Sequence, residues 1–221
     1  EKPVQSKNKM LTTIGYQING KVNYALEGSV FISGAAVQWL RDQLGIISSA
    51  SEIEALAETV ENNGGITFIT AMAGLGAPYW DMYARGAILG LTQGVTDKHI
   101  VRSTLESLAY QTMDVLKAME KDSGIKLKTL NVDGGACANN FLMQFQSDIL
   151  NIDIIRPQYL ESTALGAAYI SGLTSGFFTS MKELQKKNQV DKEFTPAMDE
   201  NERKKLYNNW QKAVNATRQF R

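Results

Sequence analysis

The sequence predicts an α/β domain in which an antiparallel strand pair is joined to a mixed sheet with helices on both faces. Strand patterns alternate with helical patterns along most of the chain, which is typical of this class. In addition, Asn19-Gly20 lies between two strand patterns at residues 10–18 and 21–25, and Asn-Gly is a strong signal for a hairpin turn.

The composition narrows the possible partners and compartment. Of the 221 residues, 43% are hydrophobic and 21% are charged, as in ordinary globular proteins. Lys plus Arg equals Asp plus Glu at 23 each, which argues against nucleic acid or an acidic membrane as a partner. The single cysteine excludes an internal disulfide and suits a reducing compartment, so we expect a cytoplasmic location.

The sequence shows no signal for membrane insertion or secretion. No apolar run approaches the ~18 residues that a membrane helix needs, and the polar N-terminus does not resemble a signal peptide. The chain starts at Glu1 instead of a methionine, from which we expect a fragment or a processed chain.

The first half of the chain predicts helices and strands in alternation around one irregular loop. The loop, Ala73–Arg85, contains Gly, Pro and aromatic residues, which suggests a shaped surface loop with its own packing. The expected elements are a helix at Ser33–Gly45, a helix from a capping box at Ser51–Glu54 to about Asn62, and strands at Ile66–Met72 and Gly86–Thr92.

The clearest helix spans Asp97–Ser123, with apolar residues on one face. After residue 150 we expect a strand at Ile152–Arg156 that Pro157 ends, and a helix at Thr163–Gly176 whose small residues allow close packing. Ser180–Glu183 fits another capping box, and the last helix begins at about Glu200.

The stretch Leu127–Asn140 carries the strongest functional pattern. An apolar strand stops at Asp133-Gly134-Gly135, and a helical pattern follows at once from Phe141. Glycine has no Cβ, so a flat ligand can approach the backbone, and a helix N-terminus suits the charge of a nucleotide. The pattern is compatible with a nucleotide site, but taken alone it is a weak signal, and a simple tight connection is the commoner explanation of a glycine pair after a strand.

Several motifs together resemble a known family. Gly86–Leu91, followed by His99-Ile100 and Ser103–Glu106, is similar to the second signature of the FGGY carbohydrate kinases. Other motifs are similar to the members of that family that phosphorylate glycerol, and they occur in the same order along the chain. These motifs are Tyr24–Gly28, Gly34–Asp42, Gly74–Asp81, Val132–Ala136 with Asn139-Asn140, and Phe141–Asp148.

The resemblance implies a ribonuclease-H-like domain of the actin/hexokinase ATPase type. Residues 1–221 are then the C-terminal nucleotide-binding domain, in part, with terminal helices from about 180 onward. The opening strand, the N-terminal domain, the catalytic aspartate and the glycerol contacts are expected upstream of Glu1. With that strand absent, the strand at 10–18 has an unpaired edge, which invites self-association.

The resemblance also implies the ligands. ATP and Mg²⁺ are the expected cofactors, glycerol and ATP or ADP the small-molecule partners, and a homo-oligomer the expected assembly. No catalytic residue is expected in this chain, which should be inactive alone. A kinase for another polyol or sugar, and a non-catalytic nucleotide-binding or interaction module, remain alternatives.

Four residues match nucleotide contacts of the family by position. Gly34 and Gln38 are expected to line the pocket from the start of a helix, Gly135 to let the adenosine approach the backbone, and Asn139 to offer its side-chain amide. Gln38 as an ordinary exposed helix residue and Asn139 as an ordinary helix cap are the simpler readings.

Other candidate residues receive no catalytic role. His99, the only histidine, is expected to lie at a helix start. Cys137 is expected to be a small packing group, because no histidine lies near it in sequence. Asp133 is a weak candidate for Mg²⁺, and Trp80 and Asp81 can brace either their loop or an interface.

Overall fold

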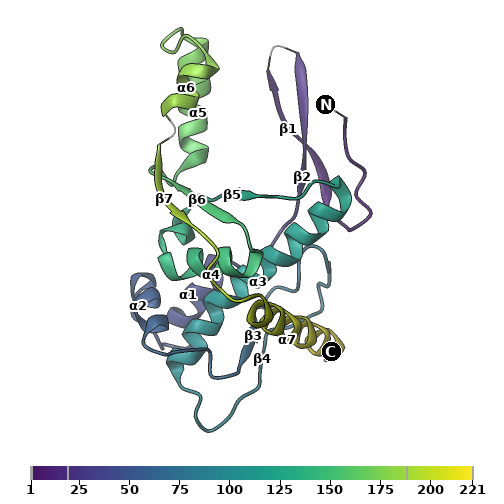
Figure 1. Cartoon of the computed structure of the whole chain (residues 1–221), viewed down its shortest axis with the longest axis vertical. Coiled ribbons are helices and arrows are strands. Elements are labelled where there is room, and N and C mark those ends of the chain that lie inside the picture. The colour runs from purple at the N-terminus through teal and green to yellow at the C-terminus, as the bar shows by residue number, and fades with distance from the viewer. Residues whose placement is uncertain (1, 19, 188, 221) are drawn as a thin grey trace. The chain divides into compact units, whose positions relative to one another are not determined.

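The chain folds into two compact units, which we call unit 1 and unit 2. The computed structural model describes residues 2–18, 20–187 and 189–220. Unit 1 consists of Glu1–Leu127 together with Met198–Arg221, and unit 2 consists of Lys128–Ala197. Each unit has its own sheets, helices and buried side chains (Figure 1).

Unit 1 contains the hairpin, a short sheet and the longest helix. Its elements are β1 (Leu11–Ile18), β2 (Lys21–Glu27), α1 (Gly34–Asp42), the 3₁₀ turn η1 (Ala50–Glu52), α2 (Ile53–Glu58), β3 (Thr67–Ile69), β4 (Ala87–Leu89), α3 (Asp97–Ser123) and α7 (Glu200–Gln219).

Unit 2 is built around a mixed sheet. Its elements are β5 (Thr129–Asn131), the 3₁₀ turn η2 (Gly135–Ala138), α4 (Asn140–Leu150), β6 (Asp153–Pro157), α5 (Ser162–Thr174), α6 (Met181–Lys187) and β7 (Val190–Phe194).

The predicted α/β class is confirmed, but the strands are distributed differently. Within the described residues they form three small sheets instead of one mixed sheet with an attached pair. β1 and β2 are antiparallel, as are β3 and β4, while β6 pairs parallel with β5 and antiparallel with β7. The parallel and antiparallel pairs together make the sheet of unit 2 a mixed sheet.

The predicted hairpin is confirmed, with Ile18 opposite Lys21. Asn19, in the predicted turn, lies outside the described residues. Every residue of β1 is exposed, and no third strand in the described ranges pairs with the hairpin. The predicted unpaired edge is therefore present, and it carries exposed apolar side chains such as Ile14 and Tyr16.

Helix α3 has the predicted bounds because both of its ends carry strong signals. Thr96 and His99 form a reciprocal capping box, in which the Thr96 N–H donates to His99 Nδ1 at 3.0 Å. Gly124, with φ of 69°, ends the helix in the left-handed conformation. His99 therefore lies at a helix start, as predicted.

Several predicted local details are wrong. Ser51–Glu54 does not form a capping box, because Glu52 instead accepts from the Ser48 N–H at 3.1 Å and α2 ends at Glu58. The strands predicted at 66–72 and 86–92 are reduced to β3 and β4, whereas β6 does end at Pro157, as predicted. β7, at Val190–Phe194, is not predicted at all.

The predicted close packing along 163–176 is also wrong. None of the described residues of α5 is buried. Only Gly172 is closely approached, since a Cβ there would lie 2.4 Å from Phe178 Cδ2. The later elements agree better: the Glu183 N–H donates to Ser180 Oγ at 3.3 Å, and α7 begins at Glu200.

Within unit 1, several side chains of α7 donate to one buried carboxylate, Asp114 on α3. Its Oδ2 accepts from Trp210 Nε1 at 2.7 Å and Tyr79 OH at 2.8 Å. Its Oδ1 accepts from Gln211 Nε2 at 2.7 Å and from the Tyr207 hydroxyl. Burial raises the pKa of the Asp114 carboxyl, and these donors oppose that rise.

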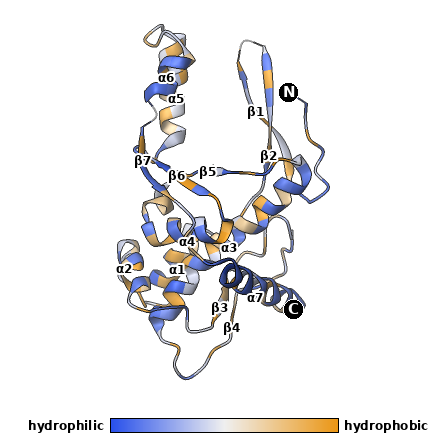
Figure 2. Cartoon of the chain, viewed as in Figure 1, coloured by the Kyte–Doolittle hydropathy of each residue, from blue (hydrophilic) through white to orange (hydrophobic). Residues whose placement is uncertain are grey.

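The position of these donors follows from the amphipathic pattern of α7. Figure 2 shows the helix as largely hydrophilic on the side seen. The buried side chains fall on one face, with Trp210 stacked on Tyr110 at a centroid distance of 5.2 Å. Asp114 therefore satisfies the polar groups that this apolar face brings into the core.

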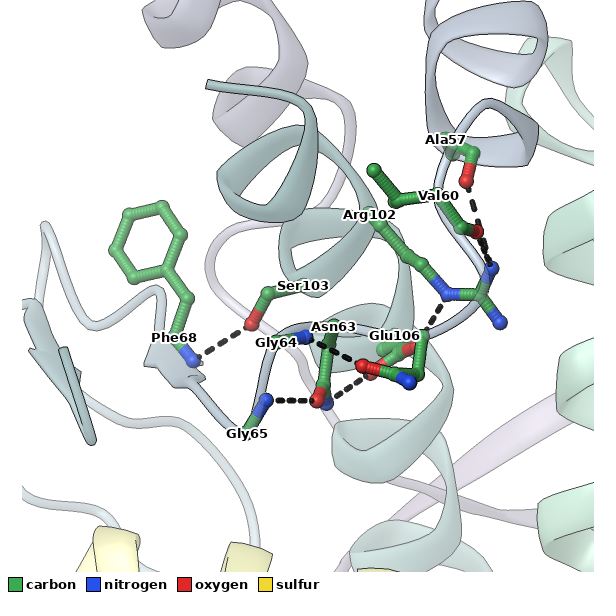
Figure 3. A network of polar contacts seen from close by, with 10 residues as sticks. Ala57, Val60, Asn63, Gly64, Gly65, Phe68, Arg102, Ser103 and Glu106 are labelled. Carbon is green, nitrogen blue, oxygen red and sulfur yellow. Dashed lines mark hydrogen bonds and ion pairs between the residues drawn. The ribbon is translucent and has the colours of Figure 1, made fainter. Parts of the chain in front are cut away.

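A second buried carboxylate, Glu106, connects α3 to the segment after α2 (Figure 3). It accepts from Arg102 Nε at 3.0 Å and from Asn63 Nδ2 at 2.7 Å. Arg102 also donates to the Val60 carbonyl at 2.6 Å. Burial raises the pKa of the Glu106 carboxyl, and its partners counteract this because they favour the ionised form.

In unit 2, helix α4 packs against β6 and β7. Its buried Ser147 hydroxyl lies 2.8 Å from the Ile152 carbonyl oxygen and 3.1 Å from the Phe194 carbonyl oxygen, and these two acceptors share its single proton. Ile149 and Ile154 are fully buried in this unit. These contacts fix α4 to the sheet, and α4 in turn begins directly after the η2 turn.

We expect Asp114→Ala to lower the free energy of unfolding by about 3 kcal/mol, because it removes the acceptor of several buried donors. Tyr207→Phe, which removes one donor and keeps the ring, should cost about 1 kcal/mol. Urea denaturation followed by tryptophan fluorescence measures both. Glu200→Ala, which breaks only the exposed ion pair with Lys204, is the control. Equal stability of Asp114→Ala and the control would contradict this role.

Candidate functional site

Gly34 and Gln38 occupy the first turns of α1, within unit 1. Gly34 is the first residue of the helix, and both residues are exposed. Ser33, at the N-cap, makes no side-chain hydrogen bond to the helix. A Cβ added at Gly34 would meet no atom within 4 Å. The start of α1 is therefore open space, next to backbone N–H groups that no capping side chain covers.

Gly135 opens the η2 turn of unit 2 and leaves similar open space. It is exposed, and a Cβ added there would meet nothing within 4 Å. Gly134, before it, has φ of 82° and donates its N–H to the Leu160 carbonyl at 2.7 Å. This left-handed conformation suits glycine. The bend is therefore not filled by packed side chains.

The helix predicted from Phe141 is confirmed as α4, and a 3₁₀ turn separates it from the glycine pair. The backbone first makes the 3₁₀ turn η2, and α4 begins at Asn140. Two 3₁₀-type contacts explain the delay: the Cys137 N–H donates to the Gly134 carbonyl at 3.2 Å, and the Asn139 N–H donates to the Ala136 carbonyl at 3.3 Å. Gly135 and Asn139 thus stand at opposite ends of this turn.

Asn139 is the N-cap of α4. Its Oδ1 accepts from the Leu142 N–H at 2.8 Å, which is the capping role that the simpler reading expects. The side-chain nitrogen takes no part in that bond, and it is the only donor of the side chain. The cap therefore fixes the oxygen of Asn139 and leaves its amide nitrogen for another partner.

The four predicted site residues fall into two pairs. Gly34 and Gln38 share α1 in unit 1, and Gly135 and Asn139 share the η2 turn in unit 2. The structure thus brings together the two members of each pair, within its own unit.

The other candidates have structural partners. Cys137 is buried, its Sγ donates to the Gly134 carbonyl at 2.8 Å, and burial raises the pKa of the thiol, which opposes a nucleophilic role. Asp81 braces its loop, since its Oδ1 accepts from the Ala84 N–H at 3.1 Å and its Oδ2 pairs with Arg218 at 3.3 Å. Trp80 Nε1 donates to the Lys9 carbonyl at 2.6 Å.

No metal site is apparent in the described ranges. No group of three or more His, Cys, Asp or Glu side chains there could hold a metal ion. Asp133 is exposed, two residues after the end of β5, and it belongs to no such group among these residues.

Sequence reasoning missed one residue at the η2 turn. Arg156 on β6 donates from Nη1 to the Cys137 carbonyl at 2.9 Å and to the Ala138 carbonyl at 3.2 Å. A single arginine in a strand pattern carries no sign of such partners, which lie 18 and 19 residues away. Only the fold reveals this contact.

Comparison with known families identifies the chain. The family described as "FGGY family of carbohydrate kinases, C-terminal domain" matches residues 1–175. The chain belongs to this family. This match confirms the resemblance to the FGGY carbohydrate kinases that the sequence motifs indicated.

Curated FGGY relatives match the chain over almost its whole length. It is 61% identical over 220 residues to a glycerol kinase of Petrotoga mobilis, covering 100% of this chain and 44% of the relative. It is 60% identical over 214 residues to that of Caldanaerobacter subterraneus, covering 97% of this chain and 43% of the relative. The chain therefore spans less than half the length of these relatives.

Solved structures establish the fold. Plasmodium falciparum glycerol kinase with ADP matches 98% of this chain and 43% of its own, with a TM-score of 0.90 and 39% identity. A xylulose kinase of Lactobacillus acidophilus matches 94% of this chain and 42% of its own, with a TM-score of 0.77 and 23% identity. The predicted actin/hexokinase-type ATPase fold is confirmed. No helix in the described residues is long and apolar enough to span a membrane.

We expect Gly135→Ala to weaken ADP binding about tenfold while leaving the fold intact. The added methyl group meets no protein atom, so its cost would come only from a ligand that needs the space. Isothermal titration of the chain with ADP measures the effect. Gly166→Ala on α5, also with nothing within 4 Å, is the matched control. Equal ADP affinity in both variants would contradict the site at Gly135.

Proposed function

We propose that this chain is the nucleotide-binding C-terminal part of a kinase that transfers the γ-phosphate of ATP to glycerol, giving glycerol 3-phosphate. The observation that carries the proposal is the 61% identity to a glycerol kinase across 220 residues. The TM-score of 0.90 to a glycerol kinase with ADP supports the nucleotide role.

In this proposal the chain binds the nucleoside end of ATP. Gly34 and Gln38 on α1 are the nucleotide contacts that unit 1 supplies. In unit 2, the open backbone face of Gly135 admits the adenosine, and the side-chain nitrogen of Asn139 donates to it. The open space at both glycines and the capping geometry of Asn139 support these roles.

The chemistry of phosphoryl transfer needs further groups. Mg²⁺, when bound to ATP, neutralises charge on the phosphate oxygens, and it is coordinated largely by phosphates and water instead of a protein cage. A base must also orient the acceptor hydroxyl, and we place this base and the glycerol contacts on polypeptide that precedes Glu1.

Glycerol is a better-supported substrate than another polyol or sugar. The xylulose and gluconate kinases of Lactobacillus acidophilus match this chain at 23% identity, which shows the fold alone. Identities of about 60% to glycerol kinases are much higher. A non-catalytic nucleotide-binding module has no comparable support.

We further propose that the protein is cytoplasmic and forms a homo-oligomer. The single cysteine supports a reducing compartment. For this chain by itself, the exposed apolar side chains on β1, which no third described strand covers, support self-association through this edge.

The test is a chimera in which this chain replaces the matching part of the Petrotoga mobilis glycerol kinase. We expect the chimera to phosphorylate glycerol with ATP, and the 221-residue chain alone to show no turnover, because it lacks the base. Coupled measurement of ADP release checks both, and gel filtration of the same samples checks the oligomer.

Each part of the proposal has an outcome that would overturn it. Turnover by the chain alone would refute the placement of the base on other polypeptide. A folded chimera that prefers another polyol or sugar to glycerol, or that binds ADP without phosphorylating glycerol, would refute the substrate or the catalytic role. A single monomeric peak at every concentration would refute the oligomer.

A further inference from the structure

Arg156 connects two strands of unit 2 to the turn that carries Gly135 and Asn139. It lies on β6, and its side chain is only 11% exposed. Its Nη1 donates to the carbonyls of Cys137 and Ala138, at 2.9 and 3.2 Å. These carbonyls belong to the last two residues of η2, at the end of a helical turn where carbonyl groups lack partners within the turn.

The guanidinium group of Arg156 is itself held in place from β7. Its Nε donates to Asp191 Oδ2 at 2.7 Å. Its central carbon lies 5.3 Å from the ring centroid of Phe194, a distance at which a cation attracts the aromatic face. The ion pair with Asp191 and the Phe194 ring therefore restrain the orientation of the Arg156 guanidinium group independently of its bonds to the η2 turn.

The bonds from Arg156 restrain the η2 turn next to Asn139, one of the two proposed nucleotide contacts in this unit. The Ala138 carbonyl belongs to the peptide group that joins Ala138 to Asn139. A hydrogen bond to this carbonyl therefore restrains the orientation of that peptide group, next to the Cα atom that bears the Asn139 side chain. The Asn139 N–H also donates to the Ala136 carbonyl at 3.3 Å, and the side-chain Oδ1 accepts from the Leu142 N–H. Restraints on both the backbone and the side chain of Asn139 therefore orient its amide nitrogen, and Arg156 supplies one of those on the backbone.

We propose that Arg156 is a positioning residue for nucleotide binding, which sets the η2 turn so that Gly135 and Asn139 meet the nucleoside together. Asp191 and Phe194 orient Arg156 for this task. The inference rests on the proposed nucleotide role of Gly135 and Asn139. Arg156 itself donates to protein carbonyls and needs no contact with the ligand.

The closing experiment titrates the full 221-residue chain with ADP and with AMP at 15 °C, where loss of stability matters least. We expect Arg156→Ala to weaken both ligands about tenfold, because both contain the adenosine that the turn receives. Asp191→Ala, at an exposed carboxylate, should weaken the binding of both nucleotides about threefold, since it removes only the ion pair that orients Arg156. Because the Asp191 side chain is exposed, we expect Asp191→Ala to remain folded, so it tests the same role if Arg156→Ala does not fold.

The matched control is Lys192→Ala. Lys192 is the neighbour of Asp191 on β7, and its ammonium lies 4.8 Å from the centroid of the same Phe194 ring. No hydrogen bond joins its side chain to η2 among the contacts of the described residues. We therefore expect unchanged affinity for both nucleotides. A general effect of weakening β7 would appear in this control as well.

A second readout separates positioning from stability. In Arg156→Ala without ligand, the backbone amide resonances of residues 135–139 should shift while those of α4 beyond its first turn stay in place. The loss of affinity should also be the same at all temperatures well below the melting midpoint. A loss that merely follows the fraction of unfolded chain would overturn the inference.

The remaining outcomes distinguish the two proposals. If the unaltered chain binds neither ADP nor AMP, the proposed nucleotide role fails, and the inference fails with it. If the unaltered chain binds both and the folded Arg156→Ala and Asp191→Ala variants bind equally well, only the positioning role fails. Equal weakening in Lys192→Ala would also overturn it.

Discussion

A buried carboxylate that must keep its hydrogen bonds holds unit 1 together. Asp114 lies on α3, the helix against which α1, α2 and β3 also pack. Its donors come from the loop at 73–85 and from α7, at the far end of the chain. An unpaired carboxylate in this position would be costly, so the loop and α7 have to be present together.

In unit 2, too, polar groups of one segment need hydrogen-bond partners from another segment of the chain. The η2 turn leaves carbonyl groups without partners inside the turn, and Arg156 satisfies them. Arg156 supplies these bonds from an adjacent strand, so the partners of these carbonyls come from outside the turn. Gly135 can then keep an open face, which is the property that a ligand site requires.

The parts of the fold that could be predicted from the sequence are those with strong local signals. Helix α3 was predictable to its ends, because the Thr96–His99 capping pair marks its start and Gly124 follows its last residue. β7 was not predictable, since Val190–Phe194 carries charged residues in its centre and forms a strand only by pairing with β6. The site residues were chosen from family motifs, whereas Arg156 depends on a long-range contact that no local pattern encodes.

Hydrogen exchange of the chain with and without saturating ADP tests the central claim most directly, namely that the η2 turn holds the nucleoside. The account predicts slower exchange at the amides of residues 134–139 and at the start of α1, with little change along α5. Saturation by ADP that leaves residues 134–139 unprotected would contradict it.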